Sequence, residues 1–173
     1  MSSIDALLAA SNLQRERPQP SGSGLQTLYL HAGQLHASSY PTEITTVLGS
    51  CVAICVWDAA AQVGGMNHFM LPFEVSGPGS TPRYATFATR ELVERVEAAG
   101  GSRSRFEARV FGGGTMLAGV TGSNDLGLRN AAAAFEILEE MKIVVVEHSV
   151  RGNHGRRVVF RTDTGEASVR RIG

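Results

Sequence analysis

The chain has 173 residues, with 16 basic and 16 acidic side chains and no formal net charge at pH 7. This length fits one domain with its own hydrophobic core, and the balanced charge argues against nucleic acid as a partner. The apolar stretches are much shorter than the roughly 20 residues that span a bilayer, and residues 1–12 lack the pattern of a secretory signal. We therefore expect a cytoplasmic protein without membrane insertion.

The N-terminal residues differ in composition from the rest of the chain. Residues 1–24 contain Pro18, Pro20 and a Ser-Gly-Ser-Gly run at 21–24. Such a composition buries too little apolar surface to order itself. We therefore expect a flexible N-terminal tail at 1–24 and a single domain at 25–173.

Short apolar or β-branched runs bounded by Gly, Pro, Asn and Ser predict eight strands after the tail. They cover residues 25–31, 44–48, 52–57, 65–71, 108–111, 143–147, 157–161 and 167–172. Segments 85–99 and 130–142 have apolar residues at helical spacing and predict helices, with Asn130 as the N-cap of the second. Because the two types do not alternate strictly, we expect an α+β fold of layered mixed β-sheets with two main helices packed on one side.

A reactive cysteine is predicted where two of these strands meet. Gly49 and Ser50 form a turn after the strand at 44–48, and Cys51 follows directly. Such a turn leaves backbone N–H groups free to stabilise an oxyanion. Cys55 lies inside an apolar run and is expected to serve packing. An extended segment would place the two cysteines ~13 Å apart, too far for a disulfide.

His68 is the predicted base. A turn through residues 58–65 returns the chain antiparallel to the Cys51 strand, so His68 comes alongside Cys51 although it lies 17 positions later (68 − 51). An imidazole beside a thiol can take its proton and hold a thiolate–imidazolium pair. A hydroxyl from Thr45 or Thr46, or a main-chain carbonyl of the same strand, would orient the ring. Single cysteines and histidines are usually packing residues, so the prediction depends on the pair.

Other uses of these residue types fit the sequence less well. There is no C-x-x-C pair and no H-E-x-x-H motif, so we expect no metal site. The glycines at 112–114 lack the G-x-x-x-x-G-K-[ST] order of a phosphate-binding loop, and Lys142 is the only lysine. We expect no cofactor.

The C-terminal part of the chain is basic. From residue 151 onward, six arginines outnumber Asp163 and Glu166, an excess of four positive charges (6 − 2). Two interpretations are open. The arginines form either a solvated hairpin face or a docking surface for an acidic partner, since complementary charge raises association rates.

Five separated motifs resemble the CheD family of chemoreceptor glutamine deamidases. The first is Leu48-Gly49-Ser50-Cys51 together with Gly64-Gly65-Met66-Asn67-His68-Phe69-Met70-Leu71-Pro72. The others are residues 83–85, 110–114, 126–130 and 155–160 with 164–165. The resemblance covers the chain from about residue 25 to its end, and the coincidence of all five motifs is far more specific than any one of them.

The resemblance implies the roles of individual residues: Cys51 as nucleophile, His68 as base and Thr45, six positions before the cysteine, as the residue that orients the imidazole. The adjacent Thr46 leaves that last role open. The resemblance also implies a fold similar to the catalytic domains of bacterial deamidating toxins. Its implied partners are methyl-accepting chemotaxis receptors and, in some bacteria, a CheC-type phosphatase.

The activity implied is that of a protein-glutamine glutaminase, a cysteine amidohydrolase that acts in chemotaxis adaptation. Cys51 would form a thioester with a receptor glutamine, ammonia would leave, and water would release glutamate. We expect Gly49, Ser50, Asn67, Gly112 and Gly113 around the oxyanion and substrate. The loops at 76–83 and 112–115 would form the rim of the cleft.

Two other functions are open. A non-catalytic chemotaxis adaptor would bind receptors or a CheC-type phosphatase and keep the cysteine for packing. A cysteine peptidase would use the same pair and would cleave the backbone of its substrate.

Overall fold

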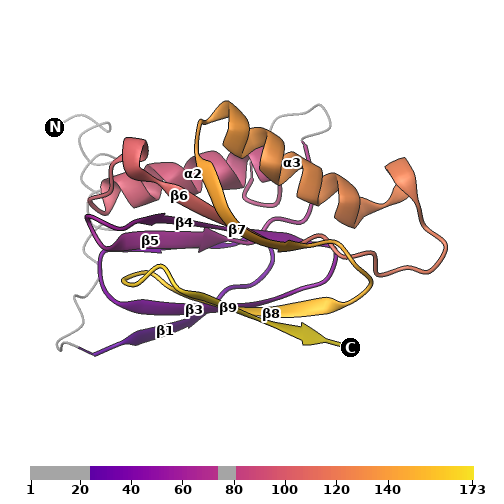
Figure 1. Ribbon diagram of the computed structural model, residues 1–173, viewed down its shortest axis with the longest axis horizontal. Helices are drawn as coiled ribbons and strands as arrows, with labels where there is room; N and C mark the ends of the chain where they lie inside the picture. The colour runs from indigo at the N-terminus through magenta and orange to yellow at the C-terminus, as the bar shows by residue number, and fades with distance from the viewer. Residues whose placement is uncertain (1–23, 74–80) are drawn as a thin grey trace, which may run out of the picture.

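The computed structural model describes residues 24–73 and 81–173, which form three layers (Figure 1). Helices α2 (Ala85–Ala98) and α3 (Leu126–Glu140) lie on one face of a five-stranded sheet, and a four-stranded sheet packs on its other face. The expected α+β fold with both helices on one side is confirmed. The tail expected at 1–24, apart from Gly24, and residues 76–80 of the expected rim loop lie outside the described residues.

Both sheets are mixed. The five-stranded sheet has the order β2 (Leu35–Ser38), β5 (Val63–Asn67), β4 (Val52–Asp58), β6 (Glu107–Gly112), β7 (Val144–Val150). The four-stranded sheet has the order β1 (Gln26–Tyr29), β3 (Thr42–Leu48), β8 (Gly155–Arg161), β9 (Ala167–Ile172). β1 with β3 and β6 with β7 pair in parallel, and the other pairs are antiparallel.

Apart from shifted strand ends, the structure differs from the predicted elements in two places. β2, a four-residue edge strand, was not predicted, because its sequence Leu-His-Ala-Ser has no β-branched residue. Helix α3 begins at Leu126 and its N-cap is Asp125, whose side chain accepts the Leu128 N–H. The prediction that Asn130 caps this helix was therefore wrong: Asn130 lies inside α3 and is fully buried.

Two apolar clusters fill the spaces between the three layers. Side chains such as Ile54, Leu92 and Leu138 fill the space between the helices and the five-stranded sheet. Ala53, Cys55 and larger side chains such as Ile44 and Phe160 fill the space between the two sheets. Because β4 is covered on both faces, its sequence is almost continuously apolar. Cys51 packs against the inter-sheet cluster, on the same side as Ala53 and Cys55.

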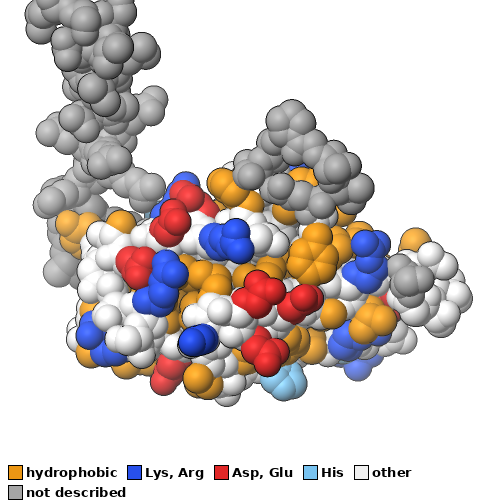
Figure 2. Space-filling view, turned by 90° about the horizontal axis from the view of Figure 1, so that it is seen from above, with side chains coloured by type: hydrophobic (Ala, Val, Ile, Leu, Met, Phe, Trp, Pro, Cys, Tyr) orange, Lys and Arg blue, Asp and Glu red, His pale blue; other side chains and the backbone are white. Residues whose placement is uncertain are grey.

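The helix-covered face carries basic and acidic side chains interspersed with hydrophobic ones (Figure 2). No helix among the described residues is long and apolar enough to cross a membrane. Of the C-terminal arginines, Arg156 is only 3% exposed and Arg161 pairs with Asp163 at 2.9 Å. Fewer of these arginines are available to a partner than the sequence indicated.

Candidate active site

Cys51 lies in the turn between β3 and β4, where the chain passes from one sheet to the other. The glycine-rich segment after β6 packs against this turn. Gly113 N–H donates to the Cys51 carbonyl at 2.9 Å, and Gly114 N–H donates to the Gly49 carbonyl at 2.9 Å. A Cβ on Gly112 would overlap the Cys51 carbonyl oxygen, and its φ of +107° favours glycine. These glycines let two backbone segments meet.

This packing changes the roles expected of two glycines. Gly112 belongs to β6 opposite Val52, and the Gly113 N–H is already bonded to the Cys51 carbonyl. Both support the turn from behind instead of facing an oxyanion. By contrast, the N–H groups of Ser50 and Cys51 donate to no other group within the described part of the chain.

The antiparallel pairing of β4 and β5 brings His68 next to Cys51. Just beyond β5, Val52 and Phe69 exchange two backbone hydrogen bonds of 3.1 and 3.0 Å. In this register His68 is opposite Ala53, which shares a strand face with Cys51. Such diagonal neighbours lie roughly 7–8 Å apart, with their Cβ atoms somewhat closer. No hydrogen bond joins the thiol to the imidazole among the described residues, and catalytic hydrogen bonds are often long without substrate.

The hydrogen bonds of Thr46 determine which nitrogen of His68 is protonated. Thr46 Oγ1 lies 2.7 Å from the Leu30 carbonyl oxygen and 2.8 Å from His68 Nδ1. The carbonyl can only accept, so the single hydroxyl proton of Thr46 goes to Leu30. Nδ1 must then donate to Oγ1. The neutral ring therefore carries its proton on Nδ1, and the lone pair on Nε2 is left to act as a base.

The structure places Thr46, and not Thr45, against the imidazole. Successive residues of β3 point to opposite faces: Thr46 is fully buried, whereas Thr45 is half-buried on the other face. The contact of Thr45 on this side is through its backbone, since its carbonyl accepts the Leu30 N–H at 2.8 Å. The position that the resemblance assigned to Thr45 is thus occupied by its neighbour.

Burial favours the neutral form of both reactive groups. Loss of solvent lowers the pKa of His68 to about 4; the nearby Leu30 backbone carbonyl opposes this lowering, and His31 adds a smaller one. Burial also raises the pKa of the Cys51 thiol. Both shifts favour a resting thiol beside a neutral imidazole over the expected thiolate–imidazolium pair.

Asn67 was expected near the substrate but serves the sheet. Its side chain is fully buried, and its Oδ1 accepts the Ile54 N–H at 2.8 Å. The backbone of the next residue turns to β2, because His68 N–H donates to the Gln34 carbonyl and the His68 carbonyl accepts from Gly33. Asn67 thus connects β4 to β5 where the two backbones diverge.

Asn130 is a site residue that the sequence analysis missed. From α3, its Nδ2 donates to the Ser50 carbonyl at 3.0 Å and to the Met70 carbonyl at 2.9 Å. Both acceptors are backbone groups far away in sequence, so only the assembled fold shows the contact. Its position in the motif at 126–130 was the only available signal.

A small cavity of about 120 Å³ opens beside the turn. Its lining includes Ser50 and the apolar side chains of Met116, Leu117 and Val120. The 112–115 loop expected on the rim contributes Gly114 and Thr115.

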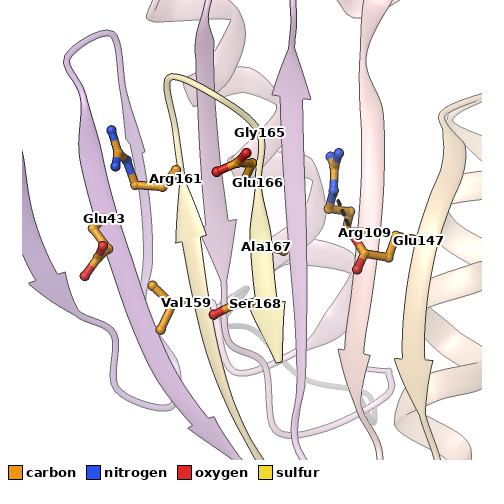
Figure 3. A pocket seen from close by; sticks show the side chains of 9 residues that line it. All are labelled: Glu43, Arg109, Glu147, Val159, Arg161, Gly165, Glu166, Ala167 and Ser168. Carbon is orange, nitrogen blue, oxygen red and sulfur yellow. Dashed lines mark hydrogen bonds and ion pairs between the residues drawn. The ribbon is translucent and has the colours of Figure 1, made fainter. Parts of the chain in front are cut away.

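A larger hollow of about 600 Å³ lies between the sheets at their other end (Figure 3). Two of its lining residues, Glu43 on β3 and Arg161 on β8, are opposite each other in the strand register. They lie at the end of β3 that is remote from the Cys51 turn. The hollow is polar, and Arg109 in it is paired with Glu147 at 3.2 Å. Its described lining contains no cysteine or histidine, so the reactive pair lies elsewhere.

The structure is thus an α+β domain in which a cysteine and a histidine lie on the same sheet face, between the two sheets. Residues 70–171 match the CheD family model, described as CheD chemotactic sensory transduction. The chain is 44% identical over 153 residues to the probable chemoreceptor glutamine deamidase CheD 1 of Anaeromyxobacter dehalogenans (strain 2CP-C), covering 88% of this chain and 89% of the relative. It is 41% identical over 144 residues to the probable chemoreceptor glutamine deamidase CheD of Trichlorobacter lovleyi (strain ATCC BAA-1151 / DSM 17278 / SZ), covering 83% and 89%. The chain belongs to the CheD family.

Proposed function

We propose that this protein is a hydrolase that converts glutamine side chains of methyl-accepting chemoreceptors to glutamate, with Cys51 as nucleophile and His68 as general base. One observation carries the chemistry: in the register set by Val52 and Phe69, Cys51 and His68 lie on the same face, and the Thr46 hydrogen bonds hold the His68 proton on Nδ1. The relatives, which are named chemoreceptor glutamine deamidases, supply the substrate class.

The first half of the reaction forms a thioester. Cys51 Sγ attacks the carboxamide carbon while its proton moves to His68 Nε2, since the resting thiol is neutral. The Ser50 and Cys51 N–H groups stabilise the resulting oxyanion. His68 then returns the proton to the departing nitrogen, the C–N bond breaks and ammonia leaves.

The second half restores the enzyme. Neutral His68 takes a proton from water, the hydroxide attacks the thioester carbon, and the thiol leaves with the proton that His68 held. The receptor then carries a glutamate in place of a glutamine, with a new negative charge and a new methylation site. We also propose a CheC-type phosphatase as a second partner.

Intact mass spectrometry of a chemoreceptor cytoplasmic fragment tests the proposal. The wild-type protein should produce the mass increase that replaces a side-chain amide by an acid, together with free ammonia. Cys51→Ala and His68→Gln variants should produce neither. An unchanged mass with retained binding would favour the adaptor function, and cleavage of the fragment backbone would favour a peptidase.

A further inference from the structure

We infer that Asn130 is a positioning residue that holds the nucleophile turn and the base-bearing segment in register and directs the Cys51 N–H toward the oxyanion. This inference rests on the proposed function and deepens it. Asn130 touches neither reacting side chain in the hydrogen bonds that the structure gives it. It acts through two backbone carbonyls.

The first contact orients the peptide that joins Ser50 to Cys51. Asn130 Nδ2 donates to the Ser50 carbonyl at 3.0 Å, from the helix side of the sheet. In a planar trans peptide the carbonyl and the N–H point in opposite directions. The Cys51 N–H therefore points away from α3. It points to the side of the sheet on which the Cys51 side chain packs toward the inter-sheet cluster.

The second contact fixes the segment that carries the base. Met70 lies two residues after His68, and its carbonyl accepts from the same nitrogen at 2.9 Å. Since Val52 pairs with Phe69, Met70 lies across from Cys51. One amide group therefore joins the nucleophile turn to the strand of the base. Misplacement of reacting groups by about 1 Å can cost on the order of 10²-fold in rate.

The hydrogen bonding of Asn130 fits this role better than a purely structural one. Helix α3 does not need it as a cap, because Asp125 serves as the cap. Its Nδ2 uses both hydrogens on the two carbonyls, whereas its buried Oδ1 has no partner among the described residues. What distinguishes Asn130 is that both of its donor hydrogens go to backbone carbonyls beside the nucleophile and the base.

Asn130→Ala and Asn130→Asp test the inference, with Leu138→Ala as the matched control. Leu138 is a fully buried residue of the same helix, eight positions after Asn130 (138 − 130) and thus about 12 Å further along the helix axis. At equal folded fraction, we expect Asn130→Ala to lower kcat for ammonia release about 10²-fold with little change in KM. Asn130→Asp should be at least as impaired, because a carboxylate cannot donate to either carbonyl.

Alkylation of Cys51 by iodoacetamide separates this role from general damage to the site. Alkylation at alkaline pH, where the thiol ionises without help from His68, requires neither the register with the base nor an oxyanion, so its rate in Asn130→Ala should stay near that of the wild-type protein. The inference would be overturned by alkylation that falls in parallel with kcat. A loss of kcat no larger than that of Leu138→Ala would overturn it equally.

Amide NMR tests the inference without any deamidation assay. In Asn130→Ala the backbone amide signals of Cys51 and Leu71, each adjacent to a released carbonyl, should shift, and Leu138→Ala should leave both in place. Unmoved signals in Asn130→Ala would overturn the inference even if the enzyme is active. If the signals shift in Asn130→Ala but the wild-type protein leaves receptor glutamines unchanged, the result would instead refute the proposed function.

Discussion

The Thr46 hydroxyl lies 2.8 Å from Nδ1 of His68, and its own proton goes to the Leu30 carbonyl 2.7 Å away. A backbone group at the end of β1 therefore sets the tautomer of the candidate base through one threonine. The two hydrogen bonds that link Leu30, Thr46 and His68 connect the four-stranded sheet to the five-stranded sheet. The packing of the two sheets and the orientation of the imidazole are consequently linked.

Replacing Thr46 by valine should lower kcat about 10-fold to 10²-fold, because the ring loses the acceptor that holds its proton on Nδ1. Valine keeps the shape of threonine, so the fold should persist, although the buried Leu30 carbonyl loses its donor at a cost of about 1–3 kcal/mol. Thr46→Ser should keep most of the activity. Steady-state ammonia release at a saturating receptor concentration measures the effect.

Thr45→Val is the informative comparison for this prediction, because the family resemblance favours Thr45 whereas the structure places Thr46 on the ring. We expect Thr46→Val to be the more impaired of the two. The opposite order would show that the imidazole turns to Thr45 when a substrate is bound.

The pH dependence of kcat/KM should show an acid limb with a midpoint near 4, because His68 has a pKa of about 4 and accepts a proton only when neutral. Below that pH the rate falls, and above it the rate should stay flat through neutral pH. Because burial raises the pKa of Cys51, iodoacetamide should label it at pH 6 no faster than an ordinary thiol. Rapid labelling at pH 6 would instead demonstrate a preformed thiolate–imidazolium pair.

The sequence predicted those parts of the site that depend on local pattern. The glycine-serine turn before Cys51 and the antiparallel return to His68 follow from strand periodicity and turn residues, and both are present in the structure. The sequence alone could not decide between Thr45 and Thr46, because the decision requires knowing which face of β3 packs against the other sheet. The resemblance favoured one residue and the packed sheets place the other on the ring.

Features that depend on tertiary packing could not be predicted from the local sequence pattern. Asn130 had the features of a helix cap because it precedes an alanine run, whereas its two acceptors lie 80 and 60 positions away in the sequence. The glycines at 112 and 113 were expected to face substrate, but the close approach of two backbones explains them. The pKa directions also required the burial that only the fold provides.

Gly112→Ala should disrupt the site more than a comparable glycine substitution elsewhere. Gly112 has φ +107° and its Cβ would meet the Cys51 carbonyl, whereas Gly100 has φ +116° with no atom within 4 Å. Gly100→Ala should therefore cost only backbone strain, about 1–3 kcal/mol. Gly112→Ala should cost more in urea unfolding and also lower kcat of the folded protein, since the Cys51 turn must move. Equal effects of the two substitutions would contradict the close packing described for the turn.

Asp58, at the end of β4 remote from Cys51, should control stability without controlling activity. Its fully buried carboxylate accepts from Arg105 at 2.8 Å and from the backbone N–H groups of Ser102, Ala60 and Ala61. Asp58→Ala leaves three backbone N–H donors without their acceptor and should destabilise the protein at pH 7, at about 1–3 kcal/mol for each buried group left unsatisfied. Arg105→Ala should cost less, because Arg105 is half-exposed and water replaces it.

The same carboxylate should give the stability a defined pH dependence. Hydrogen bonds from Arg105, and then from the backbone, lower the pKa of Asp58 from its ordinary value of 3.8 to about 2. The unfolded chain therefore binds this proton more readily than the folded protein. The contribution of Asp58 is complete above its ordinary pKa and is lost as the pH falls from about 4 to about 2. Urea unfolding should show the difference between wild type and Asp58→Ala shrinking across that interval, and a constant difference would place the carboxylate outside this network.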